Sequence, residues 1–274
     1  MQTQTERPAI RPRHMDFPFD DSVPRHWLAD NAVATHVANG VCLLFPAGER
    51  FFIRSVRHYL DRIDDPEQKL QIKGFFGQEG RHAHEHERMF AVLEAQGYQI
   101  RPFLQRYERI AYGIIEKLVP PALNLASTAA AEHFTAIMAD NALRDGPLDL
   151  AHPVVRQLLL WHACEEIEHK AVAFDVLQKV NPSYALRVAG LAMASIMLAS
   201  FWAAGTRMLL EQEGVSGKNA RRELKRLGGD NPIGKKVFLR GIREYLRRDF
   251  HPWDNDNLRL AQAYLESVGQ QLGA

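Results

Sequence analysis

Apolar residues recur every three or four positions along most of the chain, which is the spacing of amphipathic helices. Pro, Gly and Asn signals, such as Asn181-Pro182, separate the periodic segments. The predicted helices span residues 30–45, 47–63, 66–97, 102–118, 121–144, 153–179, 184–213, 218–227, 233–248 and 255–271. No run alternates with the period of two that is typical of a strand, so we expect an all-α fold.

Three regions of the chain differ in composition. Residues 1–27 are polar and carry four prolines, which predicts an extended or loosely ordered arm. Residues 28–182 hold most of the periodic helices and are expected to form the main helical bundle. Residues 183–274 comprise an apolar helix and basic helical segments, which we expect to pack on the bundle.

A repeated pattern of glutamate and histidine marks the central region. Two Glu-x-x-His pairs, Glu79/His82 and Glu166/His169, are each preceded at a distance by a lone glutamate. Residues three apart in a helix lie one turn apart on the same face, so both side chains of a pair can reach one ion. The pattern therefore predicts a metal site shared by several helices.

The two lone glutamates, Glu49 and Glu132, are expected inside the protein. Glu49 begins a stripe of apolar residues at helical spacing, and Glu132 shares its face with Ala, Thr and Leu. An ionised carboxylate in such surroundings is costly unless it is paired or bound to a metal. The small residues beside Glu132 would leave space for a substrate or dioxygen.

Two further histidines lie on the faces of the pairs. His162 is one turn before Glu166, which adds a third side chain to that metal-binding face. His86 is one turn after His82 and is either a ligand or a partner that orients one, and the second role is favoured. By contrast, His84 points about 140° away from Glu79 and is expected in solvent.

Three other residues beside the pattern have simpler expected roles. Glu165 and Glu168 flank the second pair on other helix faces, where salt bridges are the expected role. His133 is expected to pack in the core. None of the three is predicted to bind a metal.

The spacing of the pattern suits a helical bundle. Thirty residues separate Glu49 from Glu79, thirty-four separate Glu132 from Glu166, and fifty-three separate the two halves. The sequence resembles the ferritin-like di-iron carboxylate superfamily, whose order Glu, Glu-x-x-His, Glu, Glu-x-x-His is intact here. This resemblance implies a ferritin-like four-helix bundle with one long crossover, followed here by additional C-terminal helices.

Shorter phrases carry two more resemblances. The run His162-x-x-x-Glu166-x-x-His169 is similar to the last ligand helix of arylamine N-oxygenases. The phrases Phe45-Pro-Ala-Gly-Glu49 and Phe250-His-Pro-Trp253 resemble a bacterial family described as predicted metal-dependent hydrolases. The first resemblance implies oxygen chemistry, and the second implies hydrolysis.

The donor set indicates which metals to expect. Four carboxylates and two or three imidazoles without a thiolate suit two metal ions, with iron favoured and manganese or a mixed Mn/Fe pair as alternatives. Two function classes follow: a di-iron oxidase or oxygenase acting on a small organic substrate, which we favour, and a metal-dependent hydrolase. Iron storage is a weaker third class.

Residues 188–205 contain no charge and approach the length of a membrane span. We favour a helix that is buried in the protein or in a homodimer interface. The alternative is peripheral membrane contact through 188–205 and the basic region 218–248. That basic region has eleven Lys and Arg against three acidic residues. If the membrane interpretation holds, a hydrophobic substrate becomes more plausible.

Overall charge and cysteine content narrow the context. The formal net charge is +1, so no nucleic-acid partner is expected. The two cysteines, Cys42 and Cys164, lie in apolar helical segments, and no secretory signal precedes them. A cytoplasmic location, with membrane association left open, is therefore expected.

Overall fold

The computed structural model describes residues 9–144, 146, 148–228 and 234–272, and these form an all-helical protein. Within the described residues there is no strand, and the one strand-like pairing is a bridge between Leu28 and Ala151. The predicted all-α class is confirmed. The helices are α1 Ala32–Cys42, α2 Phe45–Arg57, η1 Leu60–Arg62, α3 Pro66–Ala95, α4 Arg101–Glu108, η2 Arg109–Ile115, α5 Glu116–Leu118, α6 Pro121–Arg144, α7 Pro153–His169, α8 Val172–Val180, α9 Tyr184–Gln212, α10 Gly217–Gly228, η3 Gly234–Leu239, α11 Arg240–Tyr245, η4 Pro252–Asp254 and α12 Leu258–Leu272.

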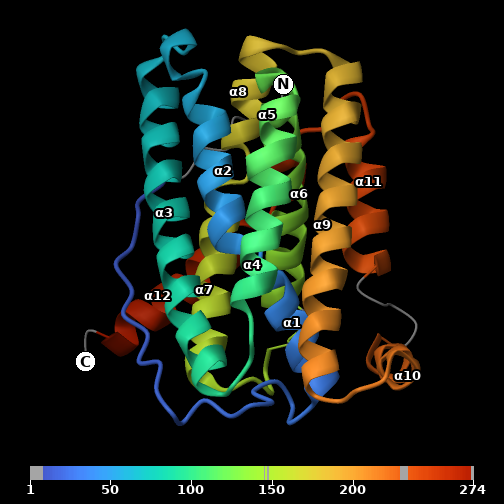
Figure 1. The fold of residues 1–274 in the computed structure, drawn as a ribbon. Coiled ribbons are helices and arrows are strands. Elements are labelled where there is room, and N and C mark those ends of the chain that lie inside the picture. The colour runs from blue at the N-terminus through green and yellow to red at the C-terminus, as the bar shows by residue number, and fades with distance from the viewer. Residues whose placement is uncertain (1–8, 145, 147, 229–233, 273–274) are drawn as a thin grey trace.

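The long helices lie alongside one another (Figure 1). Helix α2 packs on α3, and α6 packs on α7, α8 and α9. The segment α4–η2–α5 runs along the bundle and returns the chain from the end of α3 to the start of α6, so that α3 and α6 run in the same direction (Figure 1). The long connection between the two halves of the Glu/His pattern is therefore itself helical.

Helix α9 packs closely against α6. A Cβ atom added to Gly190 of α9 would lie 2.4 Å from the carbonyl carbon of Ala126 in α6, so only glycine fits at this crossing. The core beneath contains fully buried Val56, Phe75 and Phe134. This packing holds α9 as one wall of the bundle.

The other face of α9 is exposed. Ala192, Ile196, Ala199 and Ala203 lie on this face, and Ile196 is 65% exposed. Of the helices in the described part of the chain, α9 alone is long and apolar enough to span a membrane by length and composition. The helix is therefore not buried all round within one chain, and its contact with a membrane or a second copy stays a prediction.

Several predicted helices are divided in the structure. The predicted helix 153–179 is interrupted after His169, where buried Lys170 donates hydrogen bonds to the carbonyl oxygen of Asn255 (2.6 Å) and to Oδ1 of Asn257 (2.7 Å). The predicted helix 102–118 contains the π-helical turn η2 between α4 and α5. The predicted helix 47–63 is divided into α2 and the short η1. The helix predicted over 233–248 is divided into η3 and α11, and its first residue, 233, lies outside the described residues.

The N-terminal arm has no helix between residue 9 and Ala32, as its prolines predict. It is nevertheless anchored, because Phe17, Val23 and Trp27 are buried. The Trp27 indole donates a hydrogen bond to Oδ1 of Asn39 at 3.0 Å. Residues 9–27 are thus extended and not loose, and the expectation for residues 1–8 lies outside the described residues.

Candidate metal centre

The structure brings the predicted site residues together from four helices. Glu49 comes from α2, the first Glu-x-x-His pair from α3, Glu132 from α6, and the second pair with His162 from α7. Their side chains are buried, with exposed fractions of 0–4%. We call this set the Glu/His cluster, and its members are Glu49, Glu79, His82, Glu132, His162, Glu166 and His169.

One half of the Glu/His cluster surrounds His169. Its Nε2 atom lies 3.1 Å from Oε1 of Glu79, 3.4 Å from Oε2 of Glu132 and 3.4 Å from Oε1 of Glu166. Donor atoms of Glu79, Glu166 and His169 all lie within 4.8 Å of one another. These three side chains could therefore hold a single ion, with Glu132 beside them.

The other half surrounds His162. Its Nε2 atom lies 3.5 Å from Oε1 of Glu49 and 3.0 Å from Oε1 of Glu166. His82 approaches from α3, with its Nδ1 atom 3.8 Å from the same Glu166 oxygen. Since this oxygen is close to His162 and also to His169, Glu166 joins the two halves.

Many donor atoms of the cluster lack a hydrogen-bond partner. Both carboxylate oxygens of Glu49, Glu79 and Glu132 are buried without a partner, as are Nδ1 of His82 and Nε2 of His169. Leaving so many buried polar atoms unpaired is costly, and native proteins rarely do it. The oxygen and imidazole donors fit divalent ions such as iron or manganese. Among the described residues, no cysteine belongs to a group of side chains that could hold a metal ion.

Burial and mutual repulsion perturb the pKa values of these carboxyl groups. Burial, with repulsion from Glu79 and Glu166, raises the pKa of Glu49 and that of Glu132 well above the usual value. Burial likewise raises the pKa of Glu79 to about 7. Without metal, these groups hold protons that a bound cation would replace.

The pKa values of two groups shift in the direction opposite to the one that burial alone would cause. Although burial alone would lower the pKa of His169, the carboxylates of Glu166 and Glu132 raise it well above the usual value. Although burial alone would raise the pKa of Glu166, the charges of His169 and His162 and the hydrogen bond with His162 lower it well below the usual range. Glu166 is thus the carboxylate of the cluster best stabilised as an anion.

Hydrogen bonds from outside the cluster fix two imidazoles. The Nε2 atom of His82 lies 3.0 Å from the Glu165 carboxylate, which can only accept, so Nδ1 presents its lone pair to the site. Nδ1 of His169 donates to Oε1 of Gln78 at 2.9 Å, which leaves Nε2 as the metal-facing atom. Second-sphere bonds of this kind orient metal ligands.

His86 contacts the site through another histidine. Its Nε2 atom lies 2.8 Å from Nδ1 of His162, which leaves Nε2 of His162 directed at Glu49 and Glu166. This geometry favours the orienting role expected for His86, although donor atoms of Glu49, His86 and His162 also lie within 4.8 Å of one another. The exposure of His84 and the buried position of His133, beside the carbonyl oxygen of Gly241, are as expected.

A cavity of about 90 Å³ opens beside Glu49. Its walls come from α2, α6, α9 and the segment α4–η2–α5, and they are mostly apolar. Thr135 on the predicted small-residue face of Glu132 lines it, and so do Ser127 and Ala131. Of the Glu/His cluster, Glu49 alone lines this cavity, so it connects the candidate metal centre to the space where a substrate could lie.

The comparison with protein families agrees with this metal-binding arrangement. The model of a family described as predicted metal-dependent hydrolase matches residues 11–256, which is most of the chain. The chain belongs to the predicted metal-dependent hydrolase family. No curated protein and no solved structure matches it. The family resemblance seen in two short phrases is thus confirmed over nearly the whole length of the chain.

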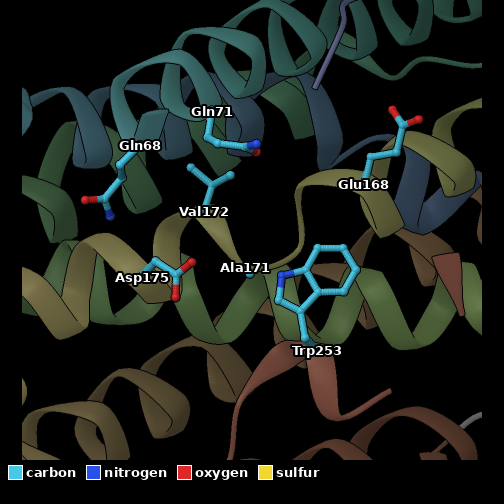
Figure 2. Close-up of a pocket in the computed structure, with 7 residues that line it drawn as sticks. All are labelled: Gln68, Gln71, Glu168, Ala171, Val172, Asp175 and Trp253. Carbon is cyan, nitrogen blue, oxygen red and sulfur yellow. The ribbon is translucent and has the colours of Figure 1, made fainter. Parts of the chain in front are cut away.

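A second cleft lies between α3 and α8 (Figure 2). Figure 2 shows Trp253, Val172 and Glu168 around it. Its volume is about 10 Å³, which is enough for about one water molecule. The cleft is therefore too small for an organic substrate, and the cavity beside Glu49 is the better candidate.

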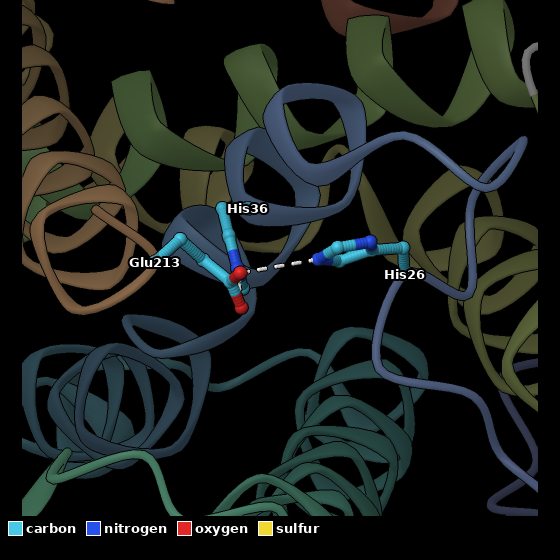
Figure 3. Close-up of side chains that lie close together, drawn as sticks. All are labelled: His26, His36 and Glu213. Atoms are coloured by element: carbon cyan, nitrogen blue, oxygen red, sulfur yellow. Dashed lines mark hydrogen bonds and ion pairs between the residues drawn. The ribbon is translucent and has the colours of Figure 1, made fainter. Parts of the chain in front are cut away.

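A separate group of His26, His36 and Glu213 lies where the arm meets α1 and α9 (Figure 3). The two histidines approach Glu213 at 3.3 and 3.4 Å, but Arg25 already donates to the same carboxylate at 2.6 Å. The side-chain oxygen of Asn39 accepts a hydrogen bond from the Trp27 indole, so the Asn39 amide nitrogen points at Nδ1 of His36 and donates to it. Nε2 of His36 therefore carries the proton and acts as a donor. This group therefore works as a hydrogen-bonded anchor and not as a metal site.

Sequence reasoning missed the partners that support the centre. Arg13 of the arm pairs with Glu165 at 2.9 Å and with Glu168 at 2.7 Å, and Gln78 donates to Glu168 at 2.8 Å. The expected salt bridges of Glu165 and Glu168 are thus present, but Glu165 also orients His82. Nothing in the spacing links Arg13 to residues more than 150 positions away, so only the fold could show it.

Proposed function

We propose that this chain is a metal-dependent hydrolase that holds two metal ions in the Glu/His cluster. The observation that carries the proposal is the set of buried, unpartnered carboxylate oxygens of Glu49, Glu79 and Glu132, which converge with imidazole nitrogens. Bound cations would satisfy such oxygens. Because the donors are carboxylate oxygens and imidazole nitrogens, the cluster is not a structural metal site built from cysteine thiolates alone. Membership of a predicted metal-dependent hydrolase family supports the same reaction class.

The geometry suggests how the ions would be shared. Glu79, Glu132 and His169 would hold one ion, and Glu49, His82 and His162 the other. Glu166, which lies between His162 and His169, would contact both. When bound, divalent ions act as Lewis acids and lower the pKa of a water molecule, so that water can attack a carbonyl group at neutral pH.

The protein contributes position and a dry environment. The bonds from Glu165 and Gln78 hold His82 and His169 in one tautomer, so that their metal-facing nitrogens need no reorganisation. Glu49 stands between the cluster and the cavity, where a substrate carbonyl would arrive. The apolar walls of the cavity exclude bulk water around that position.

Oxidation of a small organic substrate with O2 is the second candidate function. The observation that favours it is the donor set, which comprises four carboxylates and three imidazoles, all on helices. Such a set resembles di-iron carboxylate bundles more than dinuclear hydrolases, which draw more Asp and His ligands from loops. Two irons would supply the redox chemistry, and the cavity would hold the apolar substrate.

One experiment separates the two candidates. Metal-free protein is loaded anaerobically with Zn²⁺, Mn²⁺ or Fe²⁺ and assayed on neutral esters without O2, and the Fe²⁺ form is then exposed to O2. Ester hydrolysis that needs metal but not O2 supports the hydrolase. O2 consumption and iron oxidation coupled to substrate oxidation, without anaerobic ester hydrolysis by any metal form, would overturn it in favour of the second candidate.

A further inference from the structure

The cavity beside Glu49 offers little to a charged substrate. None of its described lining residues is Lys, Arg or His, and its two ionisable carboxylates are Glu49 and Glu116. In the metal-free protein, a phosphate or carboxylate there would lose its hydration with no cationic side chain in the lining to replace it. The lining side chains therefore favour a neutral, apolar occupant.

The apolar wall is formed by adaptable side chains. Met193, Met197 and Phe201 of α9 line the cavity together with Phe51 and Phe52 of α2. Methionine side chains adapt to occupants of different shape. An engineered cavity of about 150 Å³ binds benzene, so a cavity of about 90 Å³ fits an unbranched chain of roughly three to four carbons, and one of up to about six carbons once the methionines move.

A pair of tyrosine hydroxyls supplies polarity next to Glu49. Tyr107 and Tyr112 lie with their hydroxyl oxygens 2.5 Å apart. A Cβ atom on Gly48 would lie 3.6 Å from the Tyr112 oxygen and 3.8 Å from the Tyr107 oxygen, so both hydroxyls stand over the residue that precedes Glu49. The Tyr107 hydroxyl can donate its one proton either to the carbonyl oxygen of Leu44 at 3.3 Å or to Tyr112 at 2.5 Å. In the second arrangement, over the shorter distance, the Tyr112 proton is free to meet an acceptor in the cavity.

The position of Tyr112 depends on the π-helical turn η2. This turn comprises Arg109–Ile115, and π-helical turns often occur at functional sites. The Tyr112 ring stacks on Phe51 at 5.3 Å, and Glu116, which also lines the cavity, accepts two hydrogen bonds from Arg54, at 2.9 and 2.7 Å. The cavity thus combines mostly apolar walls, a carboxylate that is already paired, and two hydroxyls near Glu49.

We propose that this cavity binds a neutral ester with a short, unbranched acyl chain, and that Tyr112 positions the ester carbonyl beside Glu49. The inference rests on the proposed hydrolase function for the reaction itself. Water would add to the acyl carbon and the acyl C–O bond would break, with a proton passing to the leaving alcohol. The products are a carboxylic acid, which ionises, and the leaving alcohol.

Binding can be tested without turnover by calorimetry with hexan-1-ol and hexanoate as probes. The full-length, chelator-treated protein should bind hexan-1-ol saturably and hexanoate at least about tenfold more weakly at pH 8, because only the alcohol avoids losing the hydration of a charge. Met197→Trp should abolish alcohol binding by filling the cavity. Ile196→Trp, on the exposed face of the same helix, is the matched control and should leave it unchanged.

Turnover on p-nitrophenyl esters from acetate to decanoate tests the positioning role. We expect the best kcat/KM near the butyrate and hexanoate esters, and a shift toward longer chains in Met197→Ala. Tyr112→Phe should raise KM about fivefold or more while metal content stays unchanged. Equal binding of hexanoate and hexan-1-ol, or tight alcohol binding in Met197→Trp, would overturn the inference. Selective alcohol binding without any ester hydrolysis would overturn the hydrolase function and leave the neutral, apolar character of the occupant standing.

Discussion

The Nε2 atom of His82 lies 3.0 Å from Oε2 of Glu165, and the other oxygen of that carboxylate accepts a hydrogen bond from Arg13 at 2.9 Å. This chain of contacts connects the N-terminal arm to the candidate metal centre. It fixes the His82 tautomer, because a carboxylate can only accept. Burial raises the pKa of Glu165 to about 7, against the opposing effect of Arg13, so the guanidinium keeps this carboxylate closer to its charged form.

Glu165→Gln should therefore weaken metal binding without removing a ligand. Loss of an outer hydrogen-bond partner typically costs about 10- to 100-fold in metal affinity. The affinity can be measured by competition with a chromophoric chelator. Glu87→Gln, on the exposed side of α3, is the matched control and should keep the original affinity. An unchanged affinity in Glu165→Gln would show that His82 needs no orienting partner.

The ligand assignment predicts a change in metal stoichiometry. Replacing Glu132 or His169 by Ala should reduce the bound metal from two ions per chain, because each removes a donor from the half that surrounds His169. Elemental analysis of the loaded, desalted protein gives the count. His84→Ala removes an exposed histidine from α3 and should retain both ions. Two ions in His169→Ala would contradict the assignment.

The sequence predicted the four helices of the centre well because their residues follow local rules. The helix predicted over 121–144 coincides with α6, and the helical spacing of Glu79/His82 and Glu166/His169 places each pair on one buried face. These features depend on neighbours three or four positions apart. Local periodicity is therefore enough to find them.

The contacts that orient the centre could not be predicted in the same way. Arg13 and Gln78 act on residues 155 and 91 positions away, and no local rule joins such residues. The placement of Tyr112 depends on the π-helical turn η2, which periodicity reads as ordinary α-helix. The break after His169 depends on buried Lys170 and its partners in the C-terminal segment. These features arise from tertiary packing.

Glu79 should give the metal-free protein a pH-dependent contribution to stability. The pKa of Glu79 is raised from 4.5 when unfolded to about 7 when folded, so between these values its carboxyl group binds more protons in the folded, metal-free state than in the unfolded state. The contribution of Glu79 to the free energy of unfolding should therefore fall as the pH rises from about 5 to 7, whereas the contribution of His82 and His86, whose pKa burial lowers, rises. Burial shifts the pKa of Glu49 and Glu132 in the same direction as that of Glu79.

Urea unfolding at pH 5 and pH 8, with chelator and with bound metal, measures this effect. The metal replaces the protons, so the loaded protein should be more stable at pH 8 than at pH 5. Glu79→Gln removes the falling contribution of Glu79, so the metal-free variant should gain more stability, or lose less, between pH 5 and pH 7 than the metal-free parent protein. The same pH dependence in the variant and the parent protein would contradict the raised pKa of Glu79.

Two glycine substitutions should change the free energy of unfolding in opposite directions: Gly190→Ala at the crossing of α9 and α6, and Gly80→Ala in α3. Gly190→Ala places a Cβ atom 2.4 Å from the Ala126 backbone, which cannot move as a side-chain end could, so α9 must shift. We expect a loss of about 1–3 kcal/mol in the free energy of unfolding. Because α9 forms a wall of the cavity, hexan-1-ol binding should weaken as well.

Gly80→Ala is the matched control for that loss. Gly80 is exposed in the interior of α3, with no atom within 4 Å of an added Cβ. Alanine restricts the unfolded chain and favours the helix, so the free energy of unfolding should rise by about 0.5–1 kcal/mol. Chemical denaturation of both variants gives the comparison. If Gly190→Ala were as stable as Gly80→Ala, the close contact between α9 and α6 would not exist in solution, and the cavity wall would have to lie elsewhere.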